Sequence, residues 1–256
     1  MGRLLAVALP PLPEIRPGDD LAPLIVGAWR AAATDDDTLS PRAGDALVIT
    51  QKIVSKAEGR IVDLRSIEPR PEAIDFARRW DRDARQVEVV LRESSAVLRM
   101  ERGIIVSRTR HGFVCANAGV DASNAGAPET VTLLPQDPDG SARRLCDAIC
   151  DQLGTRIVVL ISDSFGRPWR FGITDVALGV AGFAPLDDQR GRPDANGRTM
   201  RSTVVAVADE ICSAAELAAG KTSRQPVVVV RGASLPPGDG SVRRDVVMPP
   251  EMDLFR

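Results

Sequence analysis

Short apolar segments without polar interruption set the fold class of this 256-residue chain. The clearest is RIVVLIS at 156–162, and VVVV at 227–230 has the same character. A strand that is apolar at nearly every position is buried on both faces, so we expect both segments in the middle of a covered sheet. Further strand-like runs lie at 3–9, 45–50, 59–64, 103–107 and 113–116.

Helical periodicity separates some of these runs but not others. Amphipathic patterns lie at 19–32, 141–153 and 202–219, and the first begins with aspartates suited to cap a helix. Helical spacing also occupies 71–85, whereas 87–99 fits a helix or, through VEVVL, a strand. Because helices and strands do not alternate regularly, the pattern indicates an α+β (mixed αβ) fold rather than a simple doubly wound sheet.

Three segments resemble loops or linkers by composition. Residues 163–172 are polar and glycine-rich, and 184–200 form a polar stretch of the length that functional loops have. Residues 236–256 are rich in proline and glycine, as linkers often are. We therefore expect one principal domain over 1–235 and a linker-like tail over 236–256.

Composition excludes several classes of function. The formal net charge is −2, so a broad electrostatic grip on nucleic acid is not expected. The single histidine, His111, excludes metal sites that need two histidines of one chain, and it lies in a turn-like segment. The four cysteines form no C-x-x-C pair and fit buried thiols. We find no signal-peptide pattern and no apolar stretch of membrane-spanning length, so we expect a cytoplasmic protein without a membrane partner.

A carboxylate and a hydroxyl directly follow the most apolar strand. Asp163 and Ser164 begin the sequence DSFGRPWR at the carboxyl end of that strand, a common ligand position in open αβ sheets. Hard oxygen ligands of this kind suit Mg²⁺ or Mn²⁺. Arg167 and Arg170 could neutralise phosphate or carboxylate oxygens. The structural alternative is an aspartate that caps a turn, with both arginines on the surface.

The loop sequence GVDASN at 119–124 holds a second candidate carboxylate. Asp121 could bind a metal and Asn124 could donate a hydrogen bond, while the small neighbours leave the backbone open to a ligand. An Asx-turn needs the same residues and is the alternative.

Only three of the 33 basic residues are lysines. Lys52 and Lys56 would share one face of a helical turn, where an anion could lie between them; a solvated basic surface is the alternative. Lys221 follows a glycine at a predicted helix end, so it fits either a phosphate contact or a cation that complements the helix dipole. Neither G-x-x-x-x-G-K-[ST] nor G-x-G-x-x-G occurs, so a nucleotide site would not rest on a known phosphate loop.

Five segments together resemble the coenzyme F420-0:L-glutamate ligase family, the γ-glutamyl ligases of deazaflavin biosynthesis. They are, in family order, LPEIRPGDDL (12–21), ITQKIVSKAEGR (49–60), GIIVSRTRHGFVCANAGVDASN (103–124), ISDSFGRPWRFGITDVALG (161–179) and AAELAAGKTSRQPVVVVRG (214–232). Each is weakly specific alone, but five in order over nearly the whole chain are strongly specific. The resemblance implies a γ-glutamyl ligase-like fold of two interlocked subdomains in an intertwined homodimer. It also implies a stand-alone ligase. In several bacterial relatives the segment like PPEMDLFR leads into a flavin-dependent reductase domain, whereas the present sequence ends with that segment.

The same resemblance assigns residues to the nucleotide and to the metals. Those implied to contact GTP are Leu12, Pro13, Glu14, Ile15, Gln51, Lys56 and Asn124. Those implied to ligate divalent metals, two Mg²⁺ or Mn²⁺ ions, are Asp121, Asp163 and Ser164. K⁺ is a further implied cofactor. Gln51 stands at a position that is often Ser, and Lys221 stands where archaeal members have a metal-binding Gln. Since a protonated lysine cannot ligate a cation, the chain either has one ligand or one metal fewer, or Lys221 supplies its charge beside the phosphates.

The activity implied is GTP-dependent addition of L-glutamate to the lactyl carboxylate of coenzyme F420-0, followed by extension through γ-linkages. A carboxylate is a poor electrophile, so the γ-phosphoryl group of GTP would first convert it to an acyl phosphate. Lys56, Arg167 and Arg170 would stabilise charge on the transferring group. Two alternatives stay open: a non-catalytic nucleotide or deazaflavin binding module, and a ligase of the same fold for another carboxylate.

Overall fold

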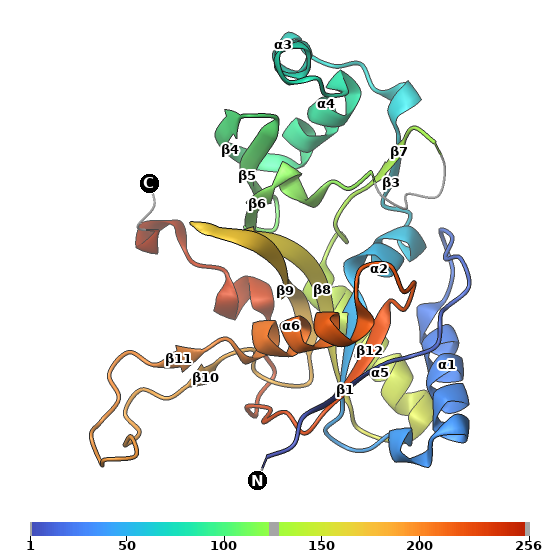
Figure 1. Ribbon diagram of the computed structural model, residues 1–256, viewed down its shortest axis with the longest axis vertical. Helices are drawn as coiled ribbons and strands as arrows, with labels where there is room; N and C mark the ends of the chain where they lie inside the picture. The colour runs from blue at the N-terminus through green and yellow to red at the C-terminus, as the bar shows by residue number, and fades with distance from the viewer. Residues whose placement is uncertain (1, 123–127, 254–256) are drawn as a thin grey trace.

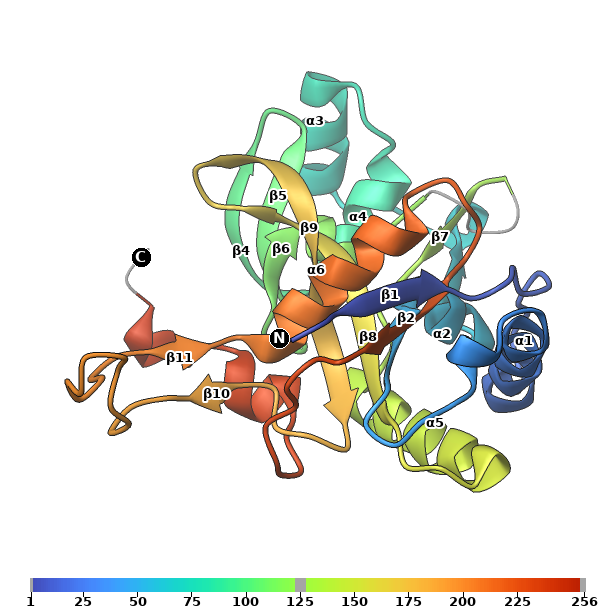
Figure 2. The ribbon, with the colours of Figure 1, turned by 60° about the horizontal axis from the view of Figure 1, so that its bottom comes forward.

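The computed structural model describes residues 2–122 and 128–253. Its centre is a five-stranded sheet of order β1-β12-β2-β8-β9 (Figures 1 and 2). The strands are β1 (Leu5–Ala8), β12 (Val227–Arg231), β2 (Ala46–Thr50), β8 (Val158–Arg167) and β9 (Arg170–Ala181). Within this sheet β2 and β8 pair in parallel, and the other neighbours pair antiparallel. The expected α+β class and the expected central strands are confirmed.

Helices cover both faces of this sheet, which is why its inner strands are apolar without interruption. α1 (Leu21–Asp35) and α5 (Pro138–Leu153) pack together on one face, and α6 (Val207–Ala219) crosses the other (Figures 1 and 2). Asp20 caps α1 by accepting a hydrogen bond from a backbone N–H, as expected. Trp29 of α1 is fully buried, and its indole N–H donates to the Leu39 carbonyl over 2.9 Å.

A second, smaller hydrophobic cluster is formed by residues between 62 and 133. Its elements are β3 (Ile61–Asp63), α3 (Pro71–Trp80), α4 (Ala84–Glu93), β4 (Ser94–Glu101), β5 (Ile104–Thr109), β6 (Val114–Ala116) and β7 (Thr130–Thr132). The ambiguous segment 87–99 is helix as far as Glu93 and strand beyond it. The helix expected over 71–85 is interrupted at Asp81, whose φ of 51° lies in the left-handed region.

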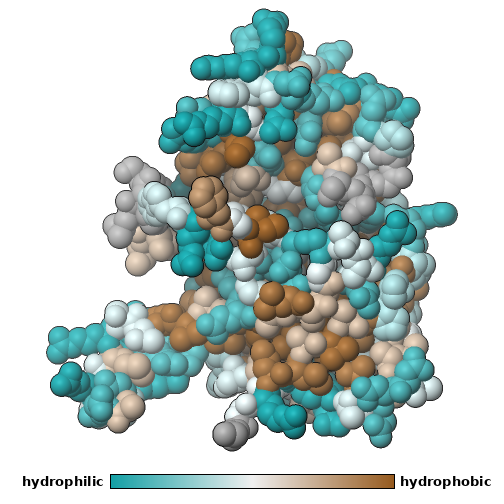
Figure 3. Space-filling view, in the orientation of Figure 1, coloured by the Kyte–Doolittle hydropathy of each residue, from teal (hydrophilic) through white to brown (hydrophobic). Residues whose placement is uncertain are grey.

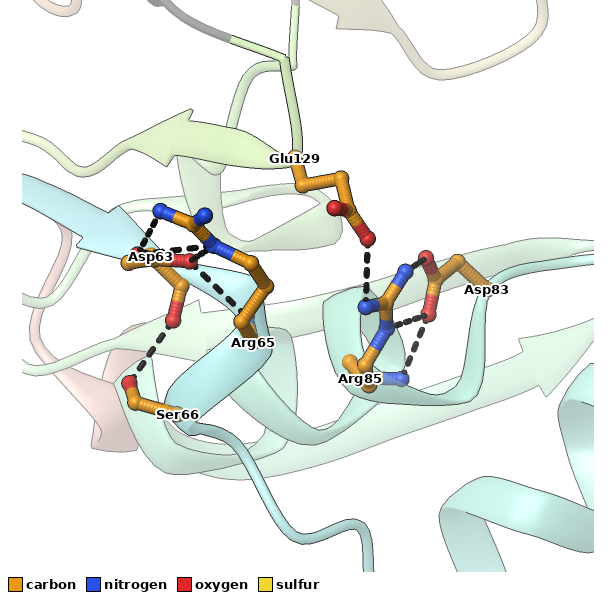
Figure 4. A network of polar contacts seen from close by, with 6 residues as sticks. All are labelled: Asp63, Arg65, Ser66, Asp83, Arg85 and Glu129. Atoms are coloured by element: carbon orange, nitrogen blue, oxygen red, sulfur yellow. Dashed lines mark hydrogen bonds and ion pairs between the residues drawn. The ribbon is translucent and has the colours of Figure 1, made fainter.

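An ion-pair network links the start of α4 to the β3–β7 ribbon (Figure 4). Asp83 caps α4 and pairs with Arg85 over 2.7 Å, and Arg85 also pairs with Glu129 beside β7 over 2.8 Å. Asp63 and Arg65 form a similar pair at the end of β3. These side chains are substantially exposed, so water screens each pair and the pairs add little to stability.

The segment 163–172 is strand, so its interpretation as a loop was wrong. β8 and β9 continue as an antiparallel hairpin as far as the turn between Arg167 and Arg170. Pairing with β9 satisfies the backbone polar groups, so polar residues and glycine do not end the strand. The tip carries two exposed aromatic side chains, Trp169 and Phe171.

Two further segments lie outside the central sheet and its helices. β10 (Asp187–Asp188) and β11 (Val204–Val205) form the base of an otherwise irregular arm that projects from it, so the helix expected from 202 begins only at Val207 (Figures 1 and 2). Residues 236–253 have the composition of a linker, yet they pack against the main body. Val242 is buried, and its backbone N–H donates to Asp139 of α5 over 2.9 Å.

Apolar side chains also gather on the surface over α6 and β1 (Figure 3). Leu5 of β1 and Leu217 of α6 are among the exposed large apolar residues. Among the described residues, every helix is too short or too polar to cross a membrane.

Candidate active site

A cavity of about 1000 Å³ opens at the carboxyl end of β2 and beside the middle of β8. Its walls include the segment 11–15, the helix α2 (Gln51–Ala57), the β8–β9 hairpin and the segment 219–226 between α6 and β12. β2 and β8 pair in parallel as far as Thr50 and Ser162, so Ser162 to Ser164 of β8 lie beside the carboxyl end of β2. This is the edge at which ligands bind in open αβ sheets, and the volume suits a small-molecule site.

Most of the residues predicted for the site line this cavity. They are Leu12, Pro13, Glu14, Ile15, Lys56, Asp121, Asp163, Ser164 and Lys221. Chain segments far apart in sequence are thus brought to one place.

Four of the predicted residues are not part of the described cavity lining. Gln51 is buried, and its Oε1 accepts a hydrogen bond from Ser55 Oγ over 2.8 Å, which is a structural role inside α2. Arg167 and Arg170 lie at the exposed turn of the β8–β9 hairpin, because the segment extends as strand instead of folding over the site. Asn124 lies outside the described residues.

Asp175 is a carboxylate of the site that no sequence motif singled out. It lies on β9 opposite Ser164, and its side chain is 12% exposed. Asp175 Oδ1 accepts a hydrogen bond from Ser164 Oγ over 2.6 Å, and Oδ2 accepts one from Ser162 Oγ over 3.1 Å. Lys221 Nζ lies 3.1 Å from Asp175 Oδ1. The signal in the sequence is an aspartate that directly precedes the apolar run VALGVA within β9, and its place opposite Ser164 follows only from the hairpin register.

Asp163 is half-buried next to this group. Burial raises the pKa of its carboxyl to about 7, and the negative charges of Asp175 and Asp121 contribute to the rise, while Lys52 opposes it. Within the described residues, no lysine or arginine lies at ion-pair distance from Asp163. A bound cation would lower the pKa of Asp163 again, because an opposite charge favours the ionised form of a carboxyl.

The donor set at this end of the cavity fits a hard divalent cation in its chemistry. Asp121, Asp163, Asp175 and Ser164 offer oxygen ligands, which Mg²⁺ and Mn²⁺ prefer. In the part of the chain that the structure describes, however, no three acidic, histidine or cysteine side chains gather as a complete metal site. Ligation by Asp121, Asp163 and Ser164 therefore stays a prediction.

The two lysines of α2 each pair with a carboxylate. Lys52 Nζ lies 2.7 Å from Asp121 Oδ2, and Lys56 Nζ lies 2.6 Å from Glu14 Oε1. The Lys56 side chain is 9% exposed and that of Glu14 is 68% exposed, so a solvated surface is the wrong interpretation for Lys56. A buried ammonium with an exposed, movable partner is well placed to receive an anion such as a phosphate.

Arg224 also lines the cavity; it lies in the segment 214–232, but the sequence alone predicted no role for it. Its φ of 59° lies in the left-handed region, which is uncommon for a residue with a β-carbon. Such backbone strain often accompanies functional sites.

The histidine and the cysteines lie outside the cavity lining of the described residues. His111 stacks on Phe113, with 5.8 Å between ring centroids. Burial raises the pKa of the Cys115 and Cys146 thiols to about 12 and raises that of Cys212 strongly. These three cysteines therefore form few thiolates at neutral pH, in keeping with the expected buried thiols, whereas Cys150 is only part-buried.

Comparison with known proteins identifies the family. Residues 11–232 match the family model described as F420-0:Gamma-glutamyl ligase. The chain is 45% identical over 250 residues to a coenzyme F420:L-glutamate ligase of Methanothermobacter thermautotrophicus, with 96% of each chain covered. It is 41% identical over 263 residues to a protein of the same name from Methanopyrus kandleri, with 100% of each chain covered. This chain therefore belongs to the F420-0:gamma-glutamyl ligase family.

Proposed function

We propose that this protein is a cytoplasmic, GTP-dependent ligase that joins L-glutamate to the lactyl carboxylate of coenzyme F420-0 and then extends the product through γ-linkages. The observation that carries the proposal is the cavity in which Lys56, Asp121, Asp163 and Ser164 come together. The relatives named coenzyme F420:L-glutamate ligase indicate the acceptor and the amino acid.

GTP binds along the segment 12–15 in this proposal, with its phosphates towards Lys56. The γ-phosphate takes the place of the Glu14 carboxylate at Lys56 Nζ, because Glu14 is exposed and free to turn into solvent. A preorganised donor at a transferring phosphoryl group lowers the barrier by about 3 kcal/mol. Lys56 is therefore the residue of this chain that we assign to transition-state stabilisation.

Asp163, with Asp121 and Ser164, is proposed to hold Mg²⁺ or Mn²⁺. Such an ion, when bound, neutralises negative charge on the phosphoryl oxygens. The serines at 162 and 164 hold the Asp175 carboxylate by hydrogen bonds, so that the hairpin wall of the site is rigid. A K⁺ requirement is part of the proposal and can be tested by replacing K⁺ with Na⁺.

The reaction proceeds in two steps. An oxygen of the F420-0 carboxylate attacks the γ-phosphorus of GTP, and the bond from that phosphorus to the β-phosphate oxygen breaks, which releases GDP. The amine of glutamate then attacks the acyl carbon, so that an amide bond forms, phosphate leaves and the amine loses a proton.

A homodimer is also part of the proposal. Trp169, Phe171 and Ile173 at the β8–β9 hairpin tip are 84%, 103% and 56% exposed, which is an apolar patch that a second copy could cover. Arg167 and Arg170 flank this tip, so a role at the phosphates would require the cavity of the other copy. Light scattering of the purified protein tests the mass expected for two chains.

The decisive experiment follows the reaction products. Protein incubated with coenzyme F420-0, L-glutamate, GTP and Mn²⁺ should release GDP and give an acceptor whose mass rises by one or more glutamyl units. Asp163→Asn should abolish both, whereas Asp151→Asn, on the exposed side of α5, should not. Binding of GTP or deazaflavin without turnover would favour the binding-module alternative. Turnover that occurs only with another acid would favour a ligase for a different carboxylate.

A further inference from the structure

Lys221 is not a simple surface cation, although its side chain is 47% exposed. Its ammonium faces three oxygens from three different elements. Nζ donates to Ser164 Oγ of β8, lies 3.1 Å from Asp175 Oδ1 of β9, and lies 3.4 Å from Glu216 Oε1 of α6. A lysine ammonium has three N–H donors, so these contacts use its full capacity.

The oxygens around Lys221 have little capacity left for another cation. Asp175 accepts hydrogen bonds from Ser162, Ser164 and Lys221. Ser164 Oγ donates to Asp175 and accepts from Lys221. A divalent ion at this carboxylate and hydroxyl would have to displace the ammonium or lie against a like charge.

Asp163 presents the opposite situation. It is the neighbouring residue of Ser164 in the chain, it lines the same cavity, and no described lysine or arginine pairs with it. Lys52 is paired with Asp121 on the other side. Lys52 thus compensates Asp121 and Lys221 compensates Asp175, whereas Asp163 is left to bind an added cation.

We propose that the Lys221 ammonium permanently occupies one cation position of the active site, between Asp175 and Ser164, so that each chain binds a single divalent ion, at Asp163. This inference rests on the proposed function in taking Asp163 as a metal ligand. It revises the expectation of two metals, and it assigns Ser164 to Lys221 rather than to a metal.

The test counts Mn²⁺ ions per chain and does not depend on turnover. Free Mn²⁺ is measured by electron paramagnetic resonance during titration of the protein without nucleotide. The wild-type chain should bind one Mn²⁺. Lys221→Gln should bind two, because the vacated oxygens then accept a metal, while Lys221→Arg, which keeps the charge, should still bind one. The half-exposed position favours folding of both variants, and circular dichroism confirms it.

Several results would overturn the inference: no Mn²⁺ or two Mn²⁺ on the wild-type chain, one Mn²⁺ on Lys221→Gln, or two on Lys221→Arg. The proposed function is judged separately by the glutamyl product. If the wild-type chain binds one Mn²⁺ but makes no glutamyl product, this inference stands and the proposed function is refuted. If it makes the product but binds two Mn²⁺, the proposed function stands and this inference is refuted.

Discussion

Glu88 of α4 offers the sharpest test of what holds the second hydrophobic cluster together. Its side chain is 3% exposed and lies in a clamp of two arginines. Arg70 donates to both carboxylate oxygens, over 2.8 and 2.9 Å, and Arg92 Nε donates over 2.7 Å. The Arg70 backbone N–H adds a fourth hydrogen bond and ties the start of α3 to α4. Glu88→Gln keeps the shape but removes the charge and turns an N–H₂ group towards these donors.

The hydrogen bonds of Glu88 and the shift of its pKa both indicate the size of the expected loss. Hydrogen bonds to charged groups contribute about 1.5–3 kcal/mol each, and loss of one partner of a buried pair costs about 3–5 kcal/mol. The arginines are about half exposed, so they regain water in the variant, which favours the lower end. Hydrogen bonding to Arg70 is the main cause that lowers the Glu88 pKa from 4.5 to about 2, which corresponds to about 3 kcal/mol. We expect Glu88→Gln to lower the free energy of unfolding by about 3 kcal/mol at pH 7.

The same argument predicts the pH dependence. A carboxyl whose pKa is lower in the folded state stabilises fully above its unfolded pKa, and the contribution is lost as pH falls from about 4.5 towards 2. Wild type therefore loses stability faster than Glu88→Gln in this window. The difference between them should shrink by about 1 kcal/mol between pH 7 and pH 3.5.

Urea unfolding followed by circular dichroism at both pH values measures these differences. Hydrogen exchange should show the loss first in peptides of α3 and α4. Glu68→Gln, at an exposed position in the segment before α3, is the control and should change little. A difference below about 1 kcal/mol at pH 7, or one that does not depend on pH, would refute the reasoning.

Three further predictions concern the core, the site and the thiols. Gly179→Ala would place a Cβ 2.3 Å from the Pro138 carbonyl carbon, so urea unfolding should show a loss of about 2 kcal/mol; an unchanged midpoint would disprove this close packing. Lys56→Gln should lower kcat for GDP release about 100-fold and Lys56→Arg much less, while an unchanged kcat would remove Lys56 from the reaction. At pH 8 a thiol-reactive disulfide reagent should label at most Cys150 in the native state and all four cysteines after unfolding, because burial raises the pKa of the other three thiols. Rapid labelling of two or more native thiols would contradict the burial.

Local sequence pattern was sufficient to predict part of the fold. The strands around 156–162 and 227–230 were predictable because a strand covered on both faces must be apolar throughout. The aspartate cap of α1 was predictable because capping depends on residues a few positions apart. Most of the residues that the family resemblance implied for the site line one cavity, while their roles stay predictions.

Contacts between distant segments decided the rest. Residues 163–172 are strand because β9 supplies hydrogen-bond partners, which composition does not reveal. The hairpin register places Asp175 opposite Ser164, and the loop after α6 brings Lys221 to both. The sequence by itself thus determined the fold class, the family and which segments carry chemistry, because these depend on local pattern and motif order. Only the tertiary structure decided which carboxylate each lysine compensates, because ion pairing depends on distances between residues far apart in the chain.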